Sequence, residues 1–157
     1  MVSLSLTRRI GMVIALTALA GCSGLKIHEK TSKHPNGTLA TSYHYYVNAE
    51  GQEVPHGVTE TWYENGVLSM STPYVDGKIT GKVVVYPRSR ELQSYTYRNG
   101  VQNGIAEGLY PNGAKKWTGY YVDGKLSGRF TCWTEDGKVV ADGVYRADQP
   151  FSGSFLM

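Results

Sequence analysis

The sequence repeats itself with a period of 23 or 24 residues, and this repeat most limits how the chain can fold. Residues 74–82 (YVDGKITGK) and 121–129 (YVDGKLSGR) are identical at six positions and lie 47 residues apart. A half-copy, YRNG at residues 97–100, lies between them. Periods of this length are typical of arrays in which each unit packs mainly against its neighbours. The sequence therefore predicts a repeat protein.

A glycine eight residues before each repeat tyrosine sets the register of the units. The pairs are Gly37/Tyr45, Gly66/Tyr74, Gly113/Tyr121 and Gly137/Tyr145, and Ser89 takes the place of the glycine before Tyr97. Five units follow from this register. The first interval between tyrosines is longer than the others, which predicts an insertion at residues 49–55. After the fifth tyrosine the last unit is cut short, and residues 151–155 supply only the start of another strand.

Each unit also contains turn signals, Asn-Gly or Asp-Gly, such as Asn65-Gly66 and Asp76-Gly77. These dipeptides tolerate the positive φ angles of tight hairpin turns. The runs between them, such as residues 58–63 and 67–75, are rich in Thr, Val, Tyr and Trp, which favour strands. Each unit is therefore predicted to be a β-hairpin. The predicted fold class is all-β, an elongated single-layer antiparallel β-meander built from tandem hairpin repeats.

Large side chains recur five residues after the glycine that opens each unit, at Trp62, Tyr86, Leu109 and Trp133. Together with the later repeat tyrosines they are expected to form one aromatic ladder, because cross-strand aromatic pairs stabilise sheets. Two interpretations of this ladder are open, a repeated core and a ligand-stacking surface. For the second, the candidate partner-binding residues are Trp62, Tyr74, Tyr86, Trp117, Tyr121 and Trp133.

The N-terminus has the layout of a signal peptide, with Arg8 and Arg9 before a largely apolar stretch at residues 10–20. Eleven helical residues rise only about 16 Å, half of a membrane's hydrocarbon core, so this stretch is too short to span one. The residues LAGC at 19–22 resemble the lipobox of bacterial lipoproteins, whose cysteine receives a diacylglyceryl group. The resemblance implies a signal peptide at residues 1–21 and lipidation at Cys22. The alternative is an ordinary secretory signal with a chance cysteine.

The residue after the lipobox cysteine is Ser23. In Gram-negative lipoproteins an aspartate here favours the inner membrane, so the resemblance implies a lipid anchor in the outer membrane that faces the periplasm. Residues 22–35 are predicted to be the lipidated cysteine and a flexible tether. The three lysines of this tether belong either to a solvated linker or to a contact with anionic headgroups. The repeat domain is predicted at residues 36–157.

No catalytic residue, metal site or cofactor is expected from the sequence. The net charge of +3 is too small to predict nucleic-acid binding, and loss of Arg8 and Arg9 with the leader lowers it to +1, from 14 basic and 13 acidic residues. The four histidines lie within the first 56 residues and lack the spacing of metal ligands. Cys132 has no partner cysteine once Cys22 is acylated, so its thiol is expected to be buried and inert.

The pattern Gly-x-x-x-x-Trp/Tyr-x-x-Asn/Asp-Gly, followed by Tyr-x-Asp/Asn-Gly-Lys and a further Gly, resembles the bacterial variant of the MORN repeat in YwqK-type antitoxins. The resemblance covers about residues 36–155, with the best units at 57–81 and 104–128. Two departures are the Arg-Ser-Arg of residues 88–90 in place of an Asn-Gly turn, and Leu109 in place of an aromatic residue. The resemblance implies a non-catalytic meander whose broad faces bind a partner, usually a protein and in some eukaryotic relatives lipid.

Combined with a periplasm-facing lipid anchor, this resemblance implies a membrane-anchored protein-binding module, an immunity protein or antitoxin that neutralises a toxin or effector. The alternative is a scaffold or adaptor of the cell envelope that binds envelope proteins, lipid or peptidoglycan. A third hypothesis is an enzyme, which would use Cys132 or the Glu60/Glu107 pair at corresponding repeat positions. The sequence names no individual partner and sets no oligomeric state.

Overall fold

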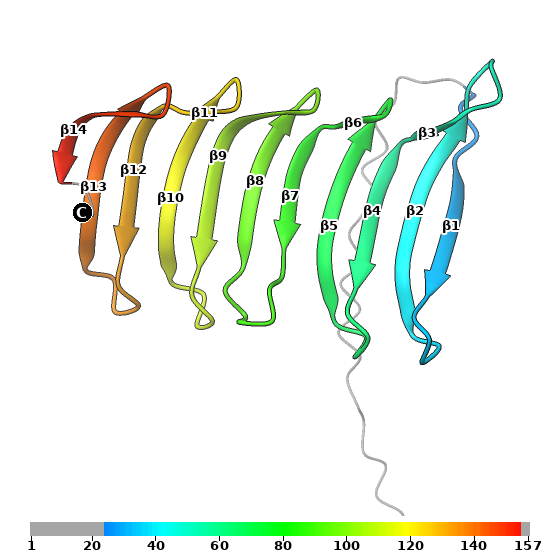
Figure 1. Ribbon diagram of the computed structural model, residues 1–157, viewed down its shortest axis with the longest axis horizontal. Coiled ribbons are helices and arrows are strands. Elements are labelled where there is room, and N and C mark those ends of the chain that lie inside the picture. Colours follow the sequence, from blue (N-terminus) through cyan, green and yellow to red (C-terminus); the bar gives the residue numbers. More distant parts are fainter. Residues whose placement is uncertain (1–23, 155–157) are drawn as a thin grey trace, which may run out of the picture.

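The computed structural model describes residues 24–154, and the regular structure of this range is entirely β-strand (Figure 1). The predicted signal peptide, Cys22 and Ser23 lie outside the described residues. Fourteen strands form one open sheet, and all of its paired strands are antiparallel. Residues 24–154 include no helix that is long and apolar enough to cross a membrane. The predicted all-β, single-layer meander is confirmed.

The strands are β1 (His28–Lys33), β2 (Leu39–Val47), β3 (Glu53–Pro55), β4 (Gly57–Trp62), β5 (Leu68–Val75), β6 (Lys78–Ile79), β7 (Gly81–Val85), β8 (Gln93–Arg98), β9 (Val101–Leu109), β10 (Lys115–Val122), β11 (Lys125–Leu126), β12 (Gly128–Trp133), β13 (Val139–Arg146) and β14 (Gln149–Ser154). The order across the sheet is β1-β2-β4-β5-β7-β8-β9-β10-β12-β13-β14. The short strands β3, β6 and β11 pair with β2, β5 and β10. Strand β14 is the extra C-terminal strand that the sequence predicts.

The sheet begins earlier in the chain than the sequence predicts. Strand β1 pairs with β2 along its whole length, from His28 opposite Tyr45 to Lys33 opposite Leu39. A turn at residues 34–38 joins the two strands, and its Asn36-Gly37 is the first turn signal of the repeat. The tether predicted for residues 22–35 is therefore wrong over residues 28–33. The physical reason is that a tight hairpin turn needs a paired strand on both of its sides.

Five-residue turns close four of the five hairpins at the lower edge in Figure 1, at residues 34–38, 63–67, 110–114 and 134–138. In each turn the first amide donates to the last carbonyl oxygen at 2.8–2.9 Å. The fourth residue of each is a glycine with φ between 78° and 86°, a conformation that favours glycine. The fifth connection, residues 86–92, is two residues longer. It contains the Arg-Ser-Arg departure from the repeat pattern.

Two-residue turns close the upper edge at residues 76–77, 99–100, 123–124 and 147–148, and both residues of each have positive φ. These angles define the turn type that Asn-Gly and Asp-Gly favour. The amide of each second residue also donates to a carbonyl oxygen of the preceding unit, at Pro55, Ile79, Gln102 and Leu126, over 2.8–2.9 Å. Strand β3, which lies in the predicted insertion, supplies the first of these oxygens. The upper turns thus tie successive units together.

The hydrophobic core is a thin layer on one face of the sheet. Among the described residues, no second sheet or helix covers either face. The buried hydrophobic residues are Tyr45, Val83, Ala106 and Ala141, and the strand register places all four on the same face. Each unit therefore buries its apolar side chains against those of the neighbouring units, as expected for a repeat array.

Candidate binding surfaces

Four aromatic rings form a row on the face that carries the buried core. The row consists of Tyr95, Trp117, Phe130 and Tyr145, on strands β8, β10, β12 and β13. The ring centroids are 6.1 Å apart at each of the three successive contacts. This spacing lies within the range of favourable aromatic pairs. We call these four residues the aromatic row and their side of the sheet the aromatic face.

Small residues between these rings let them lie close to the sheet backbone. A Cβ atom on Gly108, directly opposite Trp117, would lie 2.2 Å from the indole Nε1. A Cβ atom on Gly119 would lie 2.9 Å from Cδ2 of Phe130. Ala106, the residue opposite Gly119, is fully buried. The aromatic row is therefore built from alternating large and small side chains and fits only while the small positions stay small.

A second aromatic cluster lies at the N-terminal end of the same face. The ring of Tyr45 stacks with the rings of His28 and Tyr43, whose centroids lie 5.4 and 5.5 Å from its own. The ammonium of Lys30 lies 5.0 Å from the Tyr45 centroid and bonds the carboxylate of Glu53. The hydrogen bond to Glu53 raises the pKa of Lys30. An ion pair over an aromatic ring thus marks this end of the aromatic face.

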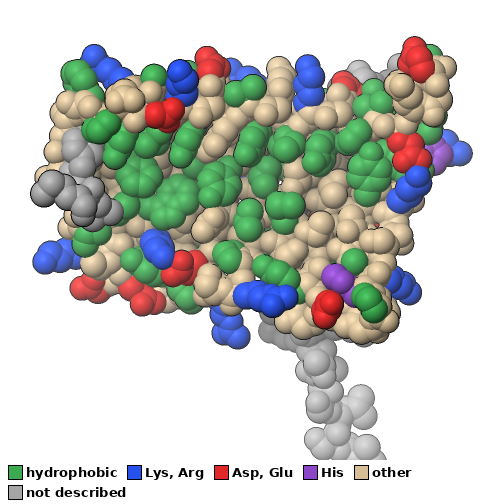
Figure 2. All heavy atoms as spheres, in the orientation of Figure 1, with side chains coloured by type: hydrophobic (Ala, Val, Ile, Leu, Met, Phe, Trp, Pro, Cys, Tyr) green, Lys and Arg blue, Asp and Glu red, His purple; other side chains and the backbone are tan. Residues whose placement is uncertain are grey.

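Figure 2 shows hydrophobic side chains as a band across the middle of the sheet, with most charged side chains towards its edges. On the strands between the two aromatic clusters, the aromatic face carries aliphatic and hydroxyl side chains, among them Thr72, Val83 and Met70. Met70 is 37% exposed. The aromatic face therefore offers a continuous surface of mixed aromatic and aliphatic character.

The structure divides the sequence-predicted partner-binding residues between the two faces. Tyr74, Trp117 and Tyr121 lie on the aromatic face, where Tyr74 and Tyr121 pair with Gly57 and Gly104. Side chains alternate along a strand, so a residue that follows an aromatic-face residue points to the other side. Trp133 follows Cys132, which pairs with Trp117, and Trp62 and Tyr86 each follow a residue that pairs with Met70. These three residues lie on the opposite face.

The single aromatic ladder expected from the sequence is therefore wrong. The expectation combined two sets of periodic positions without considering whether they lie an odd or an even number of residues apart along a strand. Only residues an even number apart lie on the same face of a sheet. Tyr95 and Phe130 were missed because their positions are not aromatic in every unit. They stand two residues before a repeat tyrosine and two residues after a unit-opening glycine, respectively. That even spacing is the signal that could have found them.

The opposite face is polar along its centre, and we call it the polar face. Directly paired residues form a row across the whole sheet: Thr31, Ser42, Glu60, Ser71, Val84, Ser94, Glu107, Thr118, Thr131, Asp142 and Ser154. Glu107 accepts hydrogen bonds from Lys82 at 2.8 Å and from Ser94 at 3.2 Å. These bonds hold the pKa of Glu107 below its ordinary value. The charges on this face are largely paired within it.

Asp142 repeats this arrangement further along the polar face. It accepts two hydrogen bonds from Arg129, the closer at 2.5 Å, and one from Thr131 at 2.9 Å. The bonds from Arg129 and then Thr131 lower the pKa of Asp142. A carboxylate held in this way stays ionised and already has its partners. Two carboxylates in the central row of the polar face, Glu107 and Asp142, are therefore bonded within that face.

The residues considered for catalysis do not form a site. Cys132 is partly buried and not fully buried as the sequence predicts, and this partial burial raises the pKa of its thiol, which disfavours the reactive thiolate. Glu60 and Glu107 both lie on the polar face, but four strand spacings separate β4 from β9. At about 4.8 Å per spacing this is roughly 19 Å, well beyond the 5–9.5 Å of paired catalytic carboxylates. Within residues 24–154 no three His, Cys, Asp or Glu side chains are grouped to hold a metal ion.

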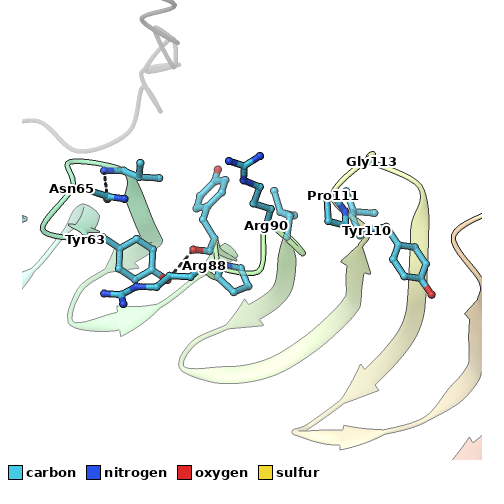
Figure 3. A pocket seen from close by; sticks show the side chains of 12 residues that line it. Tyr63, Asn65, Arg88, Arg90, Tyr110, Pro111 and Gly113 are labelled. Atoms are coloured by element: carbon cyan, nitrogen blue, oxygen red, sulfur yellow. Dashed lines mark hydrogen bonds between the residues drawn. The ribbon is translucent and has the colours of Figure 1, made fainter.

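A hollow of about 580 Å³ lies at the lower edge of the sheet, where the long connection at residues 86–92 meets its neighbours (Figure 3). Its walls include Val67, Leu92 and Leu109, and two arginines, Arg88 and Arg90, also line it. The sequence marked residues 88–90 as a departure from the repeat but gave no reason to expect a cavity. We call this feature the edge hollow.

The comparison with protein families matches residues 55–76 to the MORN repeat variant. This segment spans the end of β3, strand β4 and strand β5 through its final residue, with the two-residue turn beginning at Asp76. The presence of MORN-type repeat sequence is thus confirmed for one unit, and repeats of this type are generally non-catalytic binding modules. No curated protein matches the chain.

Proposed function

We propose that this protein is a non-catalytic protein-binding repeat module, anchored by lipid at Cys22 on the periplasmic side of the outer membrane, that neutralises a toxin or effector. The LAGC motif at residues 19–22 supports the anchor. The MORN repeat variant at residues 55–76 supports a binding role. An anchored module of this kind protects the compartment that it faces, so the target is a toxin or effector that acts in the envelope.

The observation that carries the proposal is the aromatic face. It combines the aromatic row with exposed aliphatic groups, such as Met70, on a sheet face that no other described element covers. Tryptophan and tyrosine are enriched at the energetic centres of protein interfaces. The centre of the polar face carries mainly hydroxyl and carboxylate side chains instead, and its Glu107 and Asp142 are paired with Lys82 and Arg129.

The sheet also suits binding because it is already ordered. Its strands are paired from β1 to β14, and the upper turns are bonded from unit to unit. A surface that is rigid before association loses little conformational entropy when a partner binds. In this proposal the protein inhibits by covering its target, and no chemical step is required of it.

Two charge-introducing variants on opposite faces test the binding surface. Met70→Glu places a carboxylate on the aromatic face, and Ile105→Glu places one on the polar face, at side chains that are 37% and 59% exposed. The tagged full-length protein is captured from its own cells with each variant, and bound proteins are quantified by mass spectrometry. We expect one stoichiometric partner that is lost with Met70→Glu and retained with Ile105→Glu. Equal retention by both variants would contradict the aromatic face as the binding surface.

The anchor and the immunity role need separate tests. Cys22→Ser is expected to abolish lipid labelling and move the protein from the membrane fraction to the soluble fraction. Unchanged membrane retention would contradict lipidation at Cys22.

Cells that lack the protein are expected to become sensitive to the captured partner when it is delivered to the periplasm. Several substoichiometric envelope partners and no added sensitivity would favour the envelope adaptor instead.

A further inference from the structure

The edge hollow arises where the repeat is broken. The turns at residues 63–67 and 110–114 have the regular five-residue form, whereas the connection between them at the same edge has seven residues. The longer connection lacks the bond between the first and last residues that closes a regular turn. It keeps a bond between residues three apart, in which the Arg90 amide donates to the carbonyl oxygen of Pro87 at 2.9 Å. A wider loop between two narrow turns leaves the hollow open at this edge.

The two arginines of the edge hollow lie on different sides of the connection (Figure 3). The guanidinium of Arg88 lies 5.0 Å from the ring centroid of Tyr63, and that ring's hydroxyl donates to the carbonyl oxygen of Tyr86 at 3.0 Å. Figure 3 shows Arg90 extending away from Arg88, between Asn65 on one side and Pro111 on the other. Arg88 is therefore held against an aromatic ring, while Arg90 lines the hollow on another side.

Arg90 is exposed, and no carboxylate of the described residues lies within ion-pair distance of it. No Asp or Glu is among the residues that line the edge hollow, and within residues 24–154 Arg90 forms no ion pair. The adjacent carboxylate, Glu91, is bound to Lys116 at 2.6 Å. Arg90 also has φ of 63°, a conformation that costs free energy for a residue other than glycine.

The walls of the edge hollow are mostly apolar. Val67 and Leu92 line it from two different connections and Leu109 from the end of strand β9, and Val67 is 55% exposed. The volume of about 580 Å³ lies in the range of small-ligand sites. A cation without an ion-pair partner beside apolar walls is complementary to a ligand that has both a negative group and an apolar body. Arginine matches a planar carboxylate particularly well, because it can donate two parallel hydrogen bonds.

We propose that the edge hollow binds an amphipathic carboxylate, with the carboxylate paired to Arg90 and the apolar body against Val67, Leu92 and Leu109. This chemistry is offered by a small aromatic or aliphatic acid, and also by the C-terminal residue of a peptide. The site is separate from the aromatic face and does not depend on the function proposed for that face.

The test is an NMR titration of the full-length protein in detergent micelles with matched probes. N-acetyl-tryptophan supplies a carboxylate and an apolar ring, and N-acetyl-tryptophanamide has the same ring without the charge. We expect the acid to bind at least tenfold more tightly than the amide, with chemical-shift changes centred on residues 86–92. The tripeptide Ala-Ala-Trp, with its free C-terminal carboxylate, distinguishes a peptide ligand from a small acid. Tighter binding of the tripeptide than of N-acetyl-tryptophan would indicate a peptide C-terminus, and weaker binding would indicate a small acid.

Variants show whether Arg90 carries the interaction. Arg90→Gln removes the charge and is expected to weaken binding of the acid about tenfold or more. Val67→Glu places a carboxylate in the wall and is expected to abolish binding. Arg98→Gln is the matched control, because Arg98 lies at the other end of strand β8 and does not line the hollow. Equal affinity for acid and amide, or equal weakening by Arg90→Gln and Arg98→Gln, would overturn the proposal.

Discussion

Replacing Gly108 by alanine is expected to destabilise the sheet, although alanine is ordinarily the better residue in a strand. The added Cβ would lie 2.2 Å from Nε1, 2.7 Å from Cε2 and 2.8 Å from Cδ1 of Trp117. Contacts this short force the indole to move, and the indole is itself in contact with Tyr95 and Phe130. Gly108 is buried and has no positive φ, so the substitution tests the contact and not the backbone conformation.

The magnitude follows from two opposing terms. Overpacking a well-filled site costs about 1–3 kcal/mol, whereas replacing a glycine within a strand gains about 0.5–1 kcal/mol. In the wild-type background, Gly108→Ala is therefore expected to lower the free energy of unfolding by about 1–2 kcal/mol. In a Trp117→Ala background the ring is absent, so the same substitution is expected to be neutral or stabilising. The two backgrounds should differ by about 1–3 kcal/mol.

Thermal and urea unfolding of the four proteins in this cycle, followed by circular dichroism, measures the difference. All four proteins also carry Cys22→Ser, so that the lipidation proposed at Cys22 cannot affect the comparison. A loss of 1–2 kcal/mol corresponds to a decrease in Tm of roughly 3–10 °C for a domain of this size. If Gly108→Ala has the same effect in both backgrounds, the ring does not rest on Gly108, and the alternation of large and small residues is not what holds the aromatic row.

Three further predictions concern other parts of the sheet. Ala147 has φ of 48° in the one upper turn without glycine or asparagine, so Ala147→Asn should raise the free energy of unfolding by about 0.5–1 kcal/mol; a lower Tm would contradict this. Lys82 lowers the folded-state pKa of Glu107, so this carboxylate adds stability above its ordinary pKa of 4.5 that is lost as pH falls. Glu107→Gln should therefore cost under about 1 kcal/mol at pH 7 and less in acid, as urea unfolding at several pH values can measure. The raised pKa of the Cys132 thiol should make its alkylation at neutral pH several-fold slower in the native than in the urea-unfolded protein, and equal rates would refute its protection.

The turns illustrate how much of the fold could be predicted from local sequence. Asn-Gly and Asp-Gly require particular backbone angles wherever they occur, and residues 76–77, 99–100 and 123–124 have the positive φ angles expected. Because each period has two such turns with strand-forming residues between them, the local sequence predicts a meander of hairpins. The first strand was missed because HEKTSK has the composition of a polar linker, and pairing with β2 decides its structure.

The candidate surfaces were predicted less well, and Trp62, Trp117 and Trp133 show why. All three are large aromatic residues in strands, but Trp117 lies on the aromatic face and the other two on the polar face. A shift of one residue along a strand moves a side chain to the other face of the sheet. Bulges next to Trp62 and Trp133 also interrupt the regular pairing there. The edge hollow could not be predicted because it lies between three connections whose relative positions are set by the sheet.

The sequence by itself determined the period, the turn positions and the all-β meander, because each depends on residues that are close together along the chain. The tertiary structure decided which aromatic residues share a face, where the sheet begins and that Arg90 lines an apolar hollow. These features depend on register across strands. In an antiparallel sheet a shift of one residue exchanges the two faces, so local composition alone cannot specify them.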